Sequence, residues 1–362
     1  MAITNINPVS VLYDANHGWL NPGFMVPTTV TEFTFHDTVL EKDYKYTLTN
    51  GVWSLEEYVD AIDPAEFVLI VKTDNTGTSA DDEFNIRITG ENYEYKAGSN
   101  DWVEVASSVY NQATPLLAKF PSAGEHELRF RNIGGSTRRL QIYDGGDELK
   151  LREVKQWGNT IWTRLEYAFG GCVNMNIVAT DAPVLSSVTS GTWGLVGMFQ
   201  DCTGLTNGDG FAGWDTATIK IFQVMFMGCN NPLFNPAIQN FNTSGVESVS
   251  GYRTMLYNCV GFNRDISGFK ANAQMTNASS MVRGTNMSTA NYSRLLISFA
   301  NQVFANNGPY NVDFSSQNGR TYDNTVHADL GEGNQFDNAV DARAYLVGGT
   351  AEWEIDGDSL AT

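Results

Sequence analysis

Four cysteines recur at a nearly constant spacing in the second half of the 362-residue chain. Each ends a segment of the pattern apolar-Phe-x-x-Cys or a close variant, and successive cysteines are 30, 27 and 30 residues apart. Thiolates bind zinc, but a structural zinc site uses C-x₂₋₄-C pairs, and the chain has none. We therefore predict a structural ladder of small buried hydrophobes, with disulfides the alternative that a cytoplasmic product disfavours. The ladder residues are Cys172, Cys202, Cys229 and Cys259.

The other reactive residues form no recognisable catalytic motif. No histidine has a second histidine or a cysteine at ligand spacing, and nucleophile-elbow, phosphate-loop and His-Glu-x-x-His motifs are missing. A Ser-His-Asp arrangement assembled from distant segments stays open. The carboxylates at 81–83 fit a solvated turn better than a glycosidase pair. We predict no enzyme and no cofactor.

One acidic segment is a candidate calcium loop. Residues 144–148 read Asp-Gly-Gly-Asp-Glu, which clusters oxygen ligands. The segment lacks the ligand spacing of an EF-hand loop, and a Gly-Gly turn between a strand and the repeats explains it without a metal. We therefore predict no metal site and leave calcium as the alternative.

Three aromatic residues are candidates for ligand binding: Trp193, Trp214 and Tyr252. Exposed aromatic faces stack on sugar rings, and the asparagine-rich surroundings supply amides for hydroxyl groups. The competing interpretation is that aromatics at equivalent repeat positions belong to the core, and for Trp214 it is the stronger one.

The cysteines mark an internal repeat of about 26 to 30 residues. Between them recur Phe-Asn-x-x-Ile segments at 234–238 and 262–266, and aromatic corners at 214–216, 241–243 and 269–271. Each unit is expected to contain a short helical turn, an asparagine corner, a short strand and an aromatic corner. One unit cannot bury its apolar face alone, so the pattern predicts a solenoid of stacked units.

This pattern resembles the BspA-like leucine-rich repeat of bacterial surface proteins over about residues 140–300, with the lead-in Gln156-Trp157-Gly158 matching an entry coil. Cys259 follows Leu256 instead of a phenylalanine, and the fifth copy ends in Thr285, so the last coil is the least regular. The resemblance implies adhesion and surface display, with versions in phage fibre proteins, and implies no catalytic residues. Residues 121–130 resemble one turn and strand of PKD-like domains.

The fold class we predict is mixed and mainly β: an N-terminal β-sandwich region, then an α/β leucine-rich-repeat-type solenoid with a C-terminal cap. Apolar or alternating runs at 66–71, 83–89, 92–96, 102–105 and 127–131 predict strands. The spacing of apolar residues at 289–304 predicts an amphipathic helix. The predicted domains are 1–59 (β-rich attachment region), 60–145 (PKD- or Ig-like sandwich), 146–288 (solenoid) and 289–362 (C-terminal helix and acidic cap).

Charge and hydropathy exclude some partners. The chain holds 41 acidic and 22 basic residues, a formal charge of −19, which disfavours nucleic acid. No apolar run is long enough for a membrane helix, so no membrane insertion is expected. The first basic residue is Lys42, so a secretory signal is not predicted and we expect a protein made in the host cytoplasm.

These inferences favour a non-enzymatic bacteriophage structural protein at the virion surface, a fibre or decoration protein that recognises the host. The N-terminal region would contact other virion proteins, and the solenoid would bind a host surface glycan or protein, in a homo-oligomer. A bacterial surface adhesin is the first alternative, and a tail-associated polysaccharide-degrading enzyme is the second. The lack of any cluster of catalytic residues weighs against the polysaccharide-degrading enzyme.

Overall fold

The computed structural model describes residues 32–37, 42–49, 52–57, 62–109, 116–188, 193–331 and 335–362. It divides the chain into two compact units, Met1–Asp63 and Pro64–Thr362. Much of the predicted attachment region, including residues 1–31, lies outside the described residues. The described part is mainly β, with mixed sheets and few helices.

The first unit contains an antiparallel sheet in the order β1-β2-β3. Its strands are β1 (Glu32–Asp37), β2 (Lys42–Thr49) and β3 (Val52–Glu57). In the register, Glu32 lies opposite Thr47, and Thr49 lies opposite Val52.

The second unit begins with a seven-stranded sheet in the order β10-β6-β9-β4-β11-β12, with β7 paired to β6. All these pairs are antiparallel except β11 with β12. The strands are β4 (Phe67–Lys72), β6 (Ile88–Ala97), β7 (Val103–Ser108), β9 (Glu125–Arg131), β10 (Gly134–Leu140), β11 (Leu151–Gln156) and β12 (Asn176–Ile177). A separate antiparallel pair joins β5 (Glu83–Ile86) to β8 (Leu116–Lys119).

The predicted strands of this region are confirmed, with one correction. The run at 83–89 is divided between the whole of the short strand β5 and the start of β6, and β6 also includes the run at 92–96. The carboxylate of Asp147 accepts the N–H of Asn85 at 2.7 Å and ties β5 to the loop before β11.

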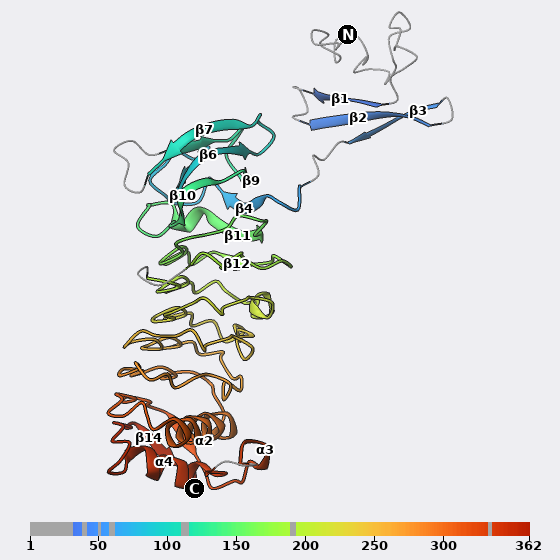
Figure 1. Ribbon diagram of the computed structural model, residues 1–362. Coiled ribbons are helices and arrows are strands. Elements are labelled where there is room, and N and C mark those ends of the chain that lie inside the picture. Colours follow the sequence, from blue (N-terminus) through green and yellow to red (C-terminus); the bar gives the residue numbers. More distant parts are fainter. Residues whose placement is uncertain are drawn as a thin grey trace, which may run out of the picture. The chain divides into compact units, whose positions relative to one another are not determined.

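Beyond β11 the chain runs through flat turns stacked in register (Figure 1). Successive backbone N–H groups donate alternately to a carbonyl of their own turn and to a carbonyl of the next turn. Gln200 donates to Gly197 of its own turn at 3.0 Å, whereas Phe199 donates to Met225 of the next turn at 2.9 Å. This alternation uses half of the donors to join turns, so a continuous α-helix cannot form. The expected short helical turn before each cysteine is therefore wrong. Within the described residues between 163 and 285 the sole helical element is the 3-10 turn η2 (Asp209–Phe211).

Two positions in each turn have left-handed backbone conformation. The first has φ between 51° and 58° and is occupied by Tyr167, Gly197, Val224, Thr254 and Ser280. The second directly precedes the cysteine or Thr285, has φ between 57° and 76°, and is occupied by Gly171, Asp201, Gly228, Asn258 and Gly284. Glycine, aspartate and asparagine tolerate this conformation, but valine and threonine do not, so stacking must override local preference at Val224 and Thr254.

The stack extends beyond the sequence repeat in both directions. Upstream, Ile142 follows strand β10 and donates to the carbonyl of Ala168 at 2.7 Å. The segment after β10 is therefore hydrogen-bonded to the first turn of the repeat. Downstream, Ser280 donates to Ser315 at 2.9 Å and Phe314 donates to Glu354 at 2.9 Å. The region expected to be a cap therefore contributes further turns, which end in the parallel pair β13 (Arg320–Tyr322) and β14 (Asp358–Leu360).

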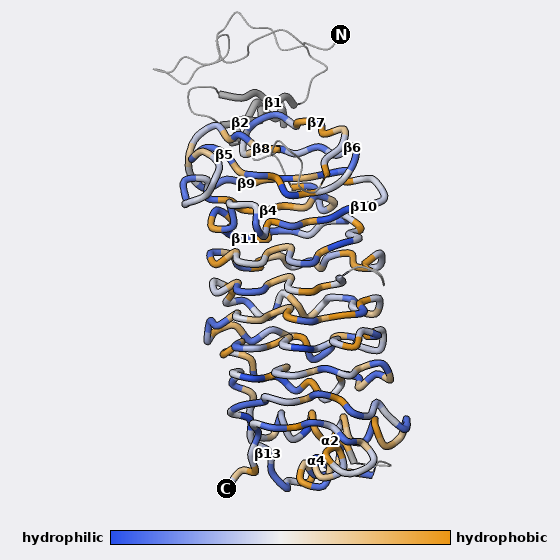
Figure 2. The backbone as a smooth tube through the Cα atoms, turned by 90° about the vertical axis from the view of Figure 1, so that its left-hand side faces the viewer, coloured by the Kyte–Doolittle hydropathy of each residue, from blue (hydrophilic) through white to orange (hydrophobic). Residues whose placement is uncertain are grey.

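Three helices interrupt these last turns: α2 (Thr289–Asn306), α3 (Ala328–Gly331) and α4 (Ala339–Val347). The predicted amphipathic helix is confirmed as α2. It begins after Ser288, whose hydroxyl accepts the N–H of Asn291 at 3.2 Å as an N-cap. Its apolar face is buried, and hydrophobic residues recur in every turn above it (Figure 2). The buried helix residues include Tyr292, Leu295, Leu296, Phe299 and Val303.

Candidate functional site

The candidate calcium loop is held together by the chain's own groups. Asp147 accepts N–H groups from Thr78 and Ser79 at 2.9 and 3.1 Å. The fully buried Lys150 places its ammonium 2.8 to 3.0 Å from the carbonyl oxygens of Ser79, Ala80 and Glu83. A protein cation thus occupies the oxygen-rich site beside Asp147. Within the described residues, no group of three or more His, Cys, Asp or Glu side chains is placed to hold a metal ion.

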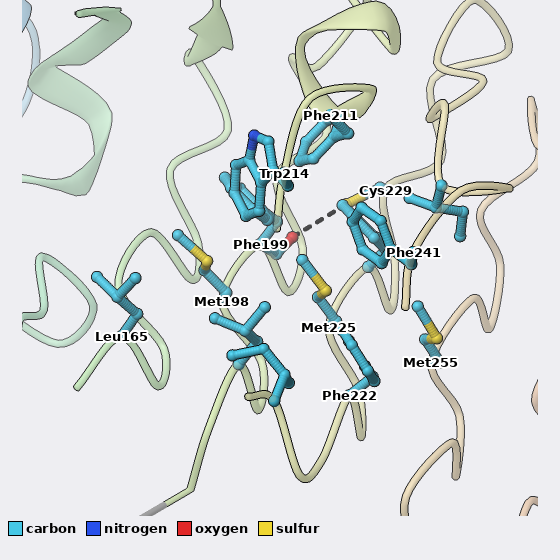
Figure 3. Close-up of a cluster of buried hydrophobic side chains, with 14 of the residues drawn as sticks. Leu165, Met198, Phe199, Phe211, Trp214, Phe222, Met225, Cys229, Phe241 and Met255 are labelled. Carbon is cyan, nitrogen blue, oxygen red and sulfur yellow. Dashed lines mark hydrogen bonds between the residues drawn. The ribbon is translucent and has the colours of Figure 1, made fainter. Parts of the chain in front are cut away.

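The four cysteines are free and fully buried. The thiol of Cys202 donates to the carbonyl of Phe169 at 3.0 Å, and that of Cys229 donates to Phe199 at 3.0 Å (Figure 3). Each of these thiols therefore bonds to the turn before its own. Burial raises the pKa of all four thiols well above the ordinary range, and neighbouring thiols add to the shift at Cys202 and Cys229.

These environments predict inert thiols. At about pH 8 the native protein should react negligibly with a disulfide reagent such as DTNB, because the nucleophile is the thiolate and burial suppresses it. After unfolding in urea all four cysteines should react, which absorbance at the reagent's thiolate band would measure. Rapid reaction of even one cysteine in the native protein would contradict this arrangement.

Two of the three candidate aromatics are core residues: Trp214 follows the core interpretation preferred for it, and Tyr252 is corrected from a candidate ligand contact to a core residue. Trp214 is 5% exposed, packs edge-on against Trp157 at 5.5 Å and donates its indole N–H to Gly210 at 2.9 Å. Tyr252 is fully buried, and its hydroxyl donates to the carbonyl of Lys270 at 3.0 Å. Burial against Phe269 and its neighbours raises the pKa of Tyr252. Neither ring face is open to a ligand, because stacking of the turns encloses both.

Trp193 is different, because its side chain is 60% exposed. It lies two residues before Leu195, whose N–H donates to Ile221 of the next turn at 3.3 Å. The equivalent positions in the adjacent turns are Thr163 and Lys220, and Lys220 pairs with Glu247 at 2.8 Å. The exposed indole thus belongs to a turn that a backbone hydrogen bond joins to the next turn, and the equivalent positions of the adjacent turns hold a hydroxyl and an ammonium group.

A second set of accessible aromatics is absent from the sequence prediction. Tyr143 is 39% exposed and stacks on Tyr167 with ring centroids 5.3 Å apart. Each ring lies over a glycine of the following turn: a Cβ on Gly170 would come within 2.9 Å of Tyr143, and one on Gly197 within 2.3 Å of Tyr167. The signal in the sequence is a tyrosine followed by a glycine one turn later, which is visible only once the register of the turns is known.

In the later turns, the guanidinium of Arg283 lies 5.4 Å from the ring centroid of Tyr257 in the preceding turn. This distance suits a cation–π contact.

In the described part of the chain, no helix is both long enough and apolar enough to cross a membrane.

The comparisons with known proteins concern the stacked turns. Residues 163–295 match the family described as DUF285, a Mycoplasma protein of unknown function. The match begins at the first turn and ends within α2, and it covers less than half of the chain. Neither a curated protein nor a solved structure matches this chain. The stacked turns are therefore similar to a family of unknown function.

Proposed function

We propose that this chain is a non-enzymatic recognition protein in which a leucine-rich-repeat-type solenoid displays a binding surface, with a sandwich-like region before it. One observation carries the proposal: Trp193 is 60% exposed on a backbone tied to the next turn, whereas the other two candidate aromatics, Trp214 and Tyr252, are buried. An exposed tryptophan on a rigid scaffold costs little conformational entropy when it binds.

The recognition role suits a phage fibre or decoration protein that binds a host surface glycan or protein as a homo-oligomer. A bacterial surface adhesin is the second candidate, and the similarity to a family described from Mycoplasma favours it. Fractionation of a culture that makes the protein distinguishes them. Immunodetection in density-purified particles supports the virion, and detection in the cell envelope supports the adhesin.

Trp193→Ala should weaken binding of the labelled full chain to its target cells by about thirtyfold, the effect of losing a central interface tryptophan worth about 2 kcal/mol. The free energy of unfolding should change by less than about 0.5 kcal/mol, because the residue is exposed. Flow cytometry over a dilution series measures the affinity.

Leu233→Ala is the matched control, since Leu233 is 73% exposed and lies on the same stack of turns. It should leave binding unchanged. Equal affinities of Trp193→Ala and wild type would contradict the assignment of this surface. Release of reducing sugar in the same assay would instead favour an enzyme.

A further inference from the structure

A surface hollow of about 580 Å³ lies between the corners of two neighbouring turns, at residues 178–182 and 207–213. Its volume is in the range of small-molecule sites. On the far side the next turn packs directly against Gly208: Ala237 donates to its carbonyl at 2.9 Å, and a Cβ on Gly208 would come within 2.1 Å of Asn235. The hollow is thus bounded by packed backbone and is separate from Trp193.

One carboxylate of the hollow is fixed in position. Asp181 accepts the backbone N–H of Trp157 with both carboxylate oxygens at 3.0 Å and that of Gly158 with Oδ2 at 2.8 Å, and the residue is half-buried. A carboxylate oxygen has two lone-pair directions, so these bonds leave acceptor capacity for a ligand. An acceptor held by backbone donors is already oriented before a ligand arrives.

A second carboxylate comes from the neighbouring turn. The Asp209 side chain is 87% exposed, and Arg264 lies 3.3 Å from its Oδ1. Asn207 orients this segment, since its Oδ1 accepts the N–H of Asp209 at 3.0 Å and its amide donates to Ile177 at 2.8 Å. Two acidic residues from different turns, Asp181 and Asp209, therefore line one hollow.

The walls between the acidic groups are small and apolar. They are formed by Ala179, Ala182, Ala212, Gly210 and Gly213. A Cβ at Gly213 would meet no atom within 4 Å, so this wall is open to the hollow. Beneath it, the buried Trp214 donates to Gly210 and supports the wall from inside.

This combination selects a class of ligand. Two carboxylates against one guanidinium, Arg264 beside Asp209, leave the hollow net acidic and disfavour an anion, and in the described part of the chain no third acidic group joins them to hold a metal. Hydroxyl donors form strong charge-assisted hydrogen bonds to carboxylates, and the C–H face of a sugar ring packs on small apolar walls. We infer that the hollow binds a neutral hexose unit of a glycan. The inference goes beyond the Trp193 surface and does not depend on it.

The test uses saturation-transfer NMR on the full chain with four probes: glucose, galactose, mannose and N-acetylglucosamine. At least one hexose should bind, and Gly213→Trp should abolish its signal because the new side chain fills the hollow. Gly349→Trp is the matched control, since a Cβ there also meets no atom within 4 Å and Gly349 does not line the hollow. Binding by none of the four probes, or equal binding by Gly213→Trp, would overturn the inference.

Asp209→Asn keeps the test decisive if Gly213→Trp folds poorly. Loss of the charge should weaken hexose binding about fivefold, since bonds to charged groups are roughly twice as strong as neutral ones. Unchanged affinity would count against the site. Trp193→Ala should retain hexose binding while losing cell binding, so failure of this inference and failure of the proposed function give different results.

Discussion

Replacement of Phe199 by alanine is expected to lower the free energy of unfolding of the stacked turns by about 3–5 kcal/mol. The ring is fully buried and stacks between Phe169 at 5.4 Å and Phe226 at 5.7 Å. It also meets Phe211 edge-on at 5.4 Å. Because backbone hydrogen bonds fix the spacing of the turns, the neighbours cannot collapse into the cavity. Urea denaturation followed by circular dichroism measures the loss.

Trp193→Ala is the control for this experiment, because it removes a larger ring from an exposed position. It should shift the urea midpoint by far less than Phe199→Ala. Phe199→Leu should fall between them, since leucine occupies the equivalent position at 256 in a later turn. A change below about 1 kcal/mol for Phe199→Ala would show that the phenylalanine column is not the core of the stack.

The sequence predicts the buried interior of the turns better than their backbone. The Met-Phe-x-x-Cys register places Phe199 and Cys202 at equivalent positions, and both are fully buried. The same register predicts a helical turn that does not form. Left-handed residues end each segment, and Val224 adopts φ 52° against its intrinsic preference. Only contacts between turns decide such a conformation, and a single repeat does not contain them.

The residue types directly before the cysteines indicate the left-handed backbone conformation at that position. Gly, Asp, Gly, Asn and Gly precede Cys172, Cys202, Cys229, Cys259 and Thr285. Every one of these residues tolerates the left-handed conformation. The alternation also has a cause in packing: a Cβ on Gly228 would come within 2.0 Å of Asp201, and one on Gly284 within 2.4 Å of Asn258. A side chain at this position in one turn therefore requires glycine in the next.

The solvent exposure of the tryptophans in the repeat region depends on contacts between turns, which the sequence of one repeat does not contain. Trp193 and Trp214 are both tryptophans of the repeat region, yet one is 60% and the other 5% exposed. The difference depends on Gly210, which accepts the Trp214 indole N–H, and on the turns on either side. The hollow is hidden for the same reason, because Asp181 and Asp209 approach it from different turns. Likewise, residues 311–320 lack the cysteine pattern, so the sequence predicts them as part of the C-terminal cap, whereas their backbone continues the stacked turns.

Replacement of Arg129 by methionine is expected to cost about 3–5 kcal/mol in the free energy of unfolding. Arg129 of β9 forms a two-bond ion pair with Glu66 at 2.7 and 3.1 Å, and both side chains are 4% exposed. Loss of the guanidinium leaves a carboxylate buried beside β4 without its counter-ion. Urea denaturation at about pH 7 measures the cost.

The double variant Glu66→Met/Arg129→Met separates the loss of the ion pair from the cost of leaving a lone carboxylate buried. It should recover most of the stability, because a buried ion pair is often no more stable than apolar side chains of similar volume. If the double variant were as unstable as Arg129→Met, the arginine's packing, including its guanidinium 5.6 Å from the Trp102 ring centroid, would carry the effect instead of the charge.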